Sequence, residues 1–162
     1  MDTAEGIIND KGETGMKILV INGPNLNFLG IREPGIYGND SYEALVSAVE
    51  NKGKELGAET EVFQSNHEGD IVDRLQKAYM EKTDGIVINP GGLTHTSVAL
   101  HDAIASVAPI PVIEVHISNV AAREDFRHIS LTAPACKGQI AGMGIRGYLY
   151  AMEELMAIFN GI

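Results

Sequence analysis

Three short runs of apolar residues, each followed by a polar loop and a segment with helical periodicity, constrain the fold of this chain most strongly. They lie at 17–22, 85–89 and 112–116. Strands that are apolar on both faces are typical of a parallel sheet covered by helices on both sides. Two further strands are predicted at 59–64 and 138–143, and the intervening periodicity predicts helices at 41–56, 69–82, 97–107 and 145–159.

Five strand–helix units of this size predict an α/β fold, a flavodoxin-like, doubly wound, five-stranded parallel sheet with strand order 2-1-3-4-5. The chain of 162 residues is long enough for one such domain, which we place at 16–162. Residues 1–15 lack periodicity and signal-peptide features, and we interpret them as a mobile leader. The first helix is expected to begin after Asp40, with Glu43 completing a capping box.

Composition excludes several classes of protein. A net charge of −10 argues against nucleic acid as a partner, because phosphate binding requires a basic surface. Cys136 is the single cysteine, so no intramolecular disulfide can form, and this fits a reducing, cytoplasmic compartment. No apolar run is long enough for a membrane-spanning helix, so no membrane partner is expected.

The loop at 23–38 is long, rich in Gly and Pro, and follows the first predicted strand directly. Loops of this length in compact domains are commonly functional, and this one carries Asn25, Arg32 and Tyr37. Ionising a tyrosine of pKa about 10 at pH 7 costs about 4 kcal/mol, which a neighbouring arginine would reduce. The alternative is a solvated Arg32 and a Tyr37 ring that packs against the body.

Two further loops are expected to meet this one where the strand order reverses. The first, 89–97, contains Asn89 and His95 and ends at Thr96 or Ser97, either of which could cap the next helix.

The second loop follows the strand that carries Glu114 and His116, which share a face because they are two residues apart. A carboxylate beside a histidine sets its tautomer and stabilises the imidazolium, as a general acid requires. A purely structural pair, or a metal site formed with His95, are the alternatives.

Three more charged residues lie near these loops. Asp102 is on the outer face of its predicted helix, where a solvated role is the simplest interpretation. Arg123 and Arg127 are one helical turn apart, and either could bind a carboxylate or pair with Glu124 or Asp125.

Four motifs resemble the type II 3-dehydroquinate dehydratases, and the similarity runs in order from Met16 nearly to the end of the chain. They are 21–27 (INGPNLN), 32–38 (REPGIYG), 89–97 (NPGGLTHTS) and 113–119 (IEVHISN). The resemblance implies a flavodoxin-like enzyme that dehydrates 3-dehydroquinate to 3-dehydroshikimate in the shikimate pathway. The elimination is anti and passes through an enolate, without metal, cofactor or Schiff base.

The resemblance also implies roles for the residues of these motifs. Tyr37 matches the base and Arg32 the lid arginine that favours tyrosinate and stabilises the transition state, while His116 matches the proton donor. Glu114 matches the partner of that histidine, and Asn25 a residue near the reacting centre.

Binding roles are implied in the same way. Asn89 matches a residue of the substrate site that helps hold a water against the enolate oxygen, and Ile117 and Ser118 match contacts to the substrate carboxylate. His95 and Arg127 match residues that bind ring hydroxyls. Asp102 matches a residue that reaches the neighbouring subunit's site, in a homododecamer built as a tetramer of trimers. A non-catalytic anion-binding module on the same fold is the alternative; a flavin or nucleotide carrier is disfavoured.

Overall fold

The computed structural model describes residues 15–31, 35 and 40–162. Its centre is a parallel sheet of five strands in the order β2-β1-β3-β4-β5, which confirms the predicted flavodoxin-like topology. The strands are β1 (Lys17–Asn22), β2 (Glu59–Gln64), β3 (Gly85–Asn89), β4 (Val112–His116) and β5 (Gly138–Ala141).

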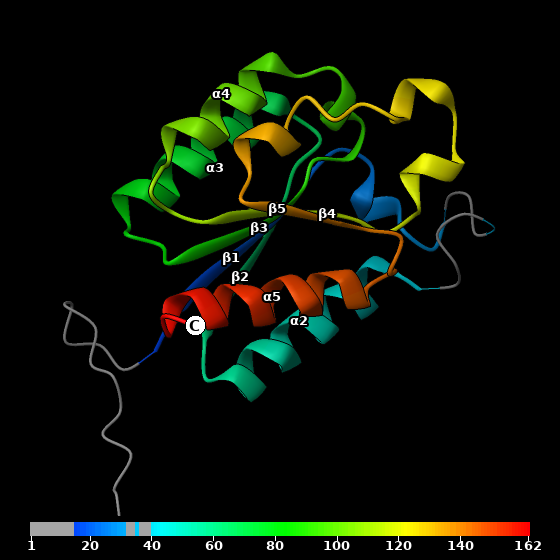
Figure 1. Cartoon of the computed structure of the whole chain (residues 1–162). Helices are drawn as coiled ribbons and strands as arrows, with labels where there is room; N and C mark the ends of the chain where they lie inside the picture. Colours follow the sequence, from blue (N-terminus) through cyan, green and yellow to red (C-terminus); the bar gives the residue numbers. More distant parts are fainter. Residues whose placement is uncertain (1–14, 32–34, 36–39) are drawn as a thin grey trace, which may run out of the picture.

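Four α-helices of the described part of the chain cover the two faces of the sheet. They are α2 (Tyr42–Leu56), α3 (Glu68–Met80), α4 (Val98–Ser106) and α5 (Arg146–Phe159). Figure 1 shows α2 and α5 on one face and α3 and α4 on the other. Alternate residues of β1 divide between the two resulting cores, because successive strand residues point to opposite faces: Val20 packs with α2 and α5, and Leu19 with α3 and α4.

The register of the sheet brings the site loops together. Asn22 at the end of β1 is the partner of Asn89 at the end of β3, so both strands finish at the same level. The chain after β1 then crosses closely over the chain after β3, and the Gly23 N–H donates to the Asn89 carbonyl at 2.8 Å. A Cβ at Gly23 would lie 2.5 Å from the Pro90 carbonyl oxygen, so this close approach requires glycine.

Several predicted boundaries are wrong at helix and strand ends. Ser41, and not Asp40, caps α2, because the Ser41 hydroxyl accepts from the Ala44 N–H at 3.1 Å. Helix α3 ends at Met80 and not at residue 82, since Lys82 adopts a left-handed backbone with φ of 57°. Strand β5 ends at Ala141 and not at residue 143, because Gly142 has a φ of 87° and turns the chain.

The connection from β4 to β5 was predicted as a loop and contains three short 3-10 turns in the structure. Two more such turns follow β1 and β3. The five are Leu26–Phe28, Gly91–His95, Val120–Ala122, Asp125–Arg127 and Ala133–Ala135. Figure 1 shows the yellow segment of this connection at the same end of the sheet as the blue turn after β1.

The leader expected at 1–15 lies outside the described residues except for Gly15, and Met16 is already part of the core. Among the helices described, none combines the length and apolar character that crossing a membrane would require.

Candidate active site

A cavity of about 160 Å³ lies at the carboxyl ends of β1, β3 and β4, where the strand order reverses. It is lined by the loop after β1, the turn after β3 and the first residues after β4. Ligands of open α/β sheets bind at this position, outside the carboxyl ends of the strands. The three loops that the sequence singled out therefore do converge.

His116 and Glu114 form the most buried pair of the site. The Nε2 atom of His116 lies 2.9 Å from Oε2 of Glu114, which has no exposed surface, while His116 lines the cavity. Since Nε2–H is directed at the carboxylate, Nδ1 is the ring nitrogen that can serve a ligand in the cavity. The predicted strand-face pairing of these two residues is confirmed.

Glu114 collects three donors besides His116. Ser130 Oγ and Gln139 Nε2 donate to its Oε2 at 2.9 and 3.0 Å, and the Thr132 hydroxyl donates to Oε1. Burial by itself raises the pKa of this carboxyl, but the hydrogen bonds from His116, Thr132 and Ser130 outweigh it and hold the pKa below the ordinary value. Glu114 is therefore kept as an oriented anion behind the histidine.

His95 is held in one tautomer at the mouth of the cavity. Its Nδ1 lies 2.8 Å from the Ile129 carbonyl, which can only accept, so Nδ1 carries a proton and in the neutral ring Nε2 is the acceptor. A neutral Nε2 suits a hydroxyl donor of a ligand. His95 is therefore more than a solvated loop residue.

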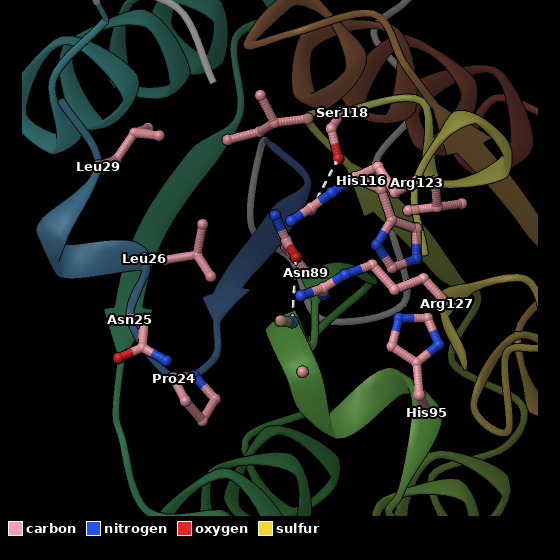
Figure 2. A pocket seen from close by; sticks show the side chains of 14 residues that line it. Pro24, Asn25, Leu26, Leu29, Asn89, His95, His116, Ser118, Arg123 and Arg127 are labelled. Carbon is pink, nitrogen blue, oxygen red and sulfur yellow. Dashed lines mark hydrogen bonds between the residues drawn. The ribbon is translucent and has the colours of Figure 1, made fainter. Parts of the chain in front are cut away.

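Asn89 has an amide whose orientation is set on both sides. Its Oδ1 accepts from the Gly91 N–H at 3.1 Å, and its Nδ2 donates to the Tyr148 hydroxyl at 2.8 Å. The side chain is almost fully buried and lines the cavity, so the second Nδ2 hydrogen is a candidate donor to a ligand. Figure 2 shows Asn89 near the centre of the cavity.

Two arginines bring positive charge to the cavity. Arg127 pairs with Glu124 at 2.8 Å, and its side chain lies between the rings of His95 and His116 in the view of Figure 2. Arg123 Nη1 donates to Ser118 Oγ at 3.3 Å, also drawn there. Ser118 and Ile117 both line the cavity, directly after β4.

The loop after β1 contributes a polar and an apolar wall. Asn25 has a left-handed backbone with φ of 70°, and its N–H donates to the Asn66 side chain at 2.9 Å. Leu26 and Leu29 are buried beside it and face the cavity. Figure 2 shows this wall opposite the histidines.

Asp102, a described residue with a predicted binding role, does not line the cavity. Arg32 and Tyr37 lie outside the described residues. Asp102 projects from α4 with its side chain 71 % exposed and contacts His101 at 3.1 Å, as predicted for an outer-face residue. Within the described part of the chain, no cluster of His, Cys, Asp and Glu has a geometry that would hold a metal ion, so the alternative set of His95, Glu114 and His116 is not assembled.

The sequence analysis missed the residues that support Glu114 and Asn89. Ser130, Thr132, Gln139 and Tyr148 are 16 to 59 residues away from the groups they contact. No local pattern reports such contacts; the one available signal was the pair of hydroxyl residues Ser130 and Thr132, on either side of Leu131, in an otherwise apolar stretch.

The fold and the site together are those of an enzyme built on a flavodoxin-like sheet, with a carboxylate–histidine couple at the carboxyl end of β4. The model of the family described as Dehydroquinase class II matches residues 16–156, and the chain belongs to this family.

Relatives and solved structures agree with this assignment. The chain is 66% identical over 141 residues to a 3-dehydroquinate dehydratase of Lachnospira eligens, covering 87% of this chain and 96% of the relative. It is 60% identical over 143 residues to one of Caldicellulosiruptor bescii, covering 86% and 98%. The crystal structure of a type II dehydroquinase from Butyrivibrio crossotus is similar with a TM-score of 0.87 at 60% identity, covering 88% of this chain and 99% of that one.

Proposed function

We propose that this protein catalyses the dehydration of 3-dehydroquinate to 3-dehydroshikimate and water, a step of the shikimate pathway. Membership of the class II dehydroquinase family and the names of its relatives support the substrate. The observation that carries the proposal is the buried Glu114–His116 couple on a cavity that also presents Asn89, His95 and Arg127. This set of groups suits a small polyhydroxylated acid.

His116 is the general acid of the proposed reaction. Hydroxide is a poor leaving group, so the departing hydroxyl must receive a proton as its C–O bond breaks. An imidazolium whose Nε2–H is bound by Glu114 keeps a second proton on Nδ1 for that transfer. The Glu114 anion stabilises the imidazolium before the transfer and orients the ring during it.

Tyr37 is the general base, and its assignment rests on the resemblance of 32–38 to the family motif. Its phenolate removes the proton next to the ketone and produces an enolate, and Arg32 favours the phenolate by its charge. Asn89 and Asn25 act at the enolate oxygen and the reacting centre, where preorganised donors stabilise the developing charge. The reaction uses no cofactor, metal or Schiff base.

Substrate binding falls to the residues at the end of β4 and in the neighbouring loops. Ile117 and Ser118 bind the carboxylate, and the nearby Arg123 guanidinium adds positive charge to this end of the cavity. His95 offers the unprotonated Nε2 to a ring hydroxyl, and Arg127 donates to another.

The functional form is a homododecamer, a tetramer of trimers located in the cytoplasm, in which Asp102 reaches the site of the neighbouring subunit. The outward side chain of Asp102 supports this role, because it lies on α4 away from its own cavity. Exposed apolar side chains on the same helix and the nearby connection, Val98, Phe126 and Ile129, supply surface that a second subunit would cover.

The test is incubation of the purified oligomer with 3-dehydroquinate while the ultraviolet absorbance of the conjugated enone carboxylate is recorded. We expect turnover, and we expect it to survive borohydride added with substrate, because no lysine imine forms. Folded oligomer without turnover would leave the anion-binding module as the function. Irreversible inactivation by borohydride would contradict the enolate route.

A further inference from the structure

Three side chains far apart in the sequence form a buried chain behind the cavity. Asn22 ends β1, Asn89 ends β3, and Tyr148 lies in the first turn of α5. Asn22 and Tyr148 have no exposed surface, and Asn89 is 4% exposed. The three therefore connect the middle of the sheet, through the helix that covers it, to the site.

The hydrogen bonds that link these three side chains all run in one direction. The Tyr148 hydroxyl donates its one proton to Oδ1 of Asn22 at 2.6 Å, so its oxygen is left to accept from Nδ2 of Asn89 at 2.8 Å. Burial raises the pKa of Tyr148, so the hydroxyl keeps its proton and the direction persists over the pH range of enzymes.

This direction determines how Asn89 presents itself to the cavity. If the amide of Asn89 turned over, its Oδ1 would face the Tyr148 oxygen and its Nδ2 would face the Gly91 N–H, which would lose both hydrogen bonds. Without the tyrosine hydroxyl, only the Gly91 contact would oppose that rotation.

We propose that Tyr148, supported by Asn22, is a positioning residue that holds the Asn89 amide with its free Nδ2 hydrogen available to the reacting ligand. Packing alone does not require the hydroxyl, because a phenylalanine would fill the same apolar space between α5 and the sheet; what it would remove is the partner of Asn22 Oδ1 and Asn89 Nδ2. The inference rests on the proposed function, since Asn89 must contact the ligand for its orientation to matter.

The experiment is a double-mutant cycle on kcat/KM for 3-dehydroquinate with Tyr148→Phe, Asn89→Ala and the combined variant, alongside thermal unfolding of each. We expect Tyr148→Phe to lower kcat/KM about tenfold, the loss of one well-placed hydrogen bond. In the Asn89→Ala background the same change should have less than about a twofold effect, because the residue through which it acts is gone. Tyr150→Phe is the matched control: the same atom is removed from the same helix, away from the cavity.

A Tyr148→Phe variant with wild-type kcat/KM would overturn the proposal, even if its Tm falls, because the hydroxyl would then be structural only. Full additivity of the two losses would overturn it as well. Should Tyr148→Phe not fold, Asn22→Ala breaks the same chain from β1 and must show the same dependence on Asn89. No turnover by the wild-type oligomer would instead contradict the proposed function, which separates the two failures.

Discussion

A carboxylate with no exposed surface lies behind the histidine of the site, and its surroundings define its role. The Glu114 carboxylate accepts hydrogen bonds from His116, Ser130, Thr132 and Gln139. Fixing the tautomer of His116 would require only the first of them. A buried carboxylate stays ionised only when such donors outweigh the cost of desolvation. The four contacts therefore hold a buried negative charge directly behind His116.

Glu114→Gln keeps the shape of the side chain and removes this charge. We expect kcat to fall about 100-fold, the low end of what a positioned acid or base contributes, because the imidazolium of His116 loses its counter-ion. Steady-state kinetics with 3-dehydroquinate measure it, and Glu55→Gln, a change at an exposed carboxylate on α2, is the control. A variant with more than half the wild-type kcat would mean that Glu114 is a structural residue only.

The same charge makes stability depend on pH. Because the folded pKa of Glu114 is lower than the unfolded pKa near 4.5, its ionised form stabilises the protein fully above that value. The unfolded chain binds the proton first as the pH falls, so this stabilisation is lost as the pH falls through the folded pKa.

The measurement is the free energy of unfolding in urea of wild type and Glu114→Gln from pH 7 to pH 3. The gap between the two free energies should be constant near pH 7 and should narrow below about pH 4.5. A gap that widened on acidification would show that the folded pKa is raised.

Residue-scale prediction from the sequence succeeded where one strand carries both partners. Glu114 and His116 are two apart on a strand, so their pairing follows from local geometry. Tyr148 occupies an inward position of an amphipathic helix, where the apolar pattern indicates a core residue and conceals the hydroxyl contact. Its role emerges only when β1, β3 and α5 are assembled.

At the scale of elements, the connection between β4 and β5 folds back and contacts Glu114 in the strand that precedes it. Ser130 and Thr132 reach Glu114 from this connection, and the Leu131 N–H donates to the Thr94 carbonyl at 2.8 Å, which ties it to the turn after β3. The connection is thus a supporting wall of the site.

Thr132→Val preserves shape and removes one donor to Glu114. We expect the free energy of unfolding to fall by about 1–2 kcal/mol and kcat to fall with it, because a buried carboxylate loses a hydrogen bond. Thr60→Val is the matched control, because the Thr60 hydroxyl oxygen is buried with no hydrogen-bond partner among the described residues, and its removal should change stability by less than about 0.5 kcal/mol. Equal effects of the two substitutions, in urea unfolding and in kinetics, would contradict this account of the connection.

Strands were predicted more accurately than helix ends. The ranges 17–22, 59–64, 85–89 and 112–116 agree with β1 to β4, because apolar runs bounded by polar loops leave little choice. The predicted start of α2 was wrong because Asp40 and Ser41 are both good N-cap residues. Only the structure shows that the Ser41 side chain accepts the capping hydrogen bond. The 3-10 turns between β4 and β5 have no periodicity of their own to reveal them.

At the scale of the whole molecule, the strand order places the site before any side chain is considered. With order 2-1-3-4-5, the reversal lies between β1 and β3, and the cavity is found there. Asp102 was correctly predicted to face outward. Its proposed role at a neighbouring subunit's site requires an assembly of several chains.

If each site is shared between two subunits, mixed oligomers of two inactive variants should recover activity. His116→Ala and Asp102→Ala oligomers should each be nearly inactive. Mixtures refolded together should regain activity, because some sites receive a native His116 from one subunit and a native Asp102 from its neighbour. Random assembly of equal amounts makes up to about a quarter of the sites native in this way. Light scattering of each preparation should give the mass of a dodecamer. Mixtures no more active than their components would contradict the sharing of Asp102.

In the proposed elimination, His116 donates a proton and Tyr37 accepts one. The most direct test is the turnover of 3-dehydroquinate, at matched oligomer concentration and confirmed folding, by wild type, His116→Ala and Tyr37→Phe. The account predicts enone absorbance from the wild type and a loss of kcat of at least about 100-fold in each variant. Turnover near the wild-type rate in either variant would contradict the assignment of that residue.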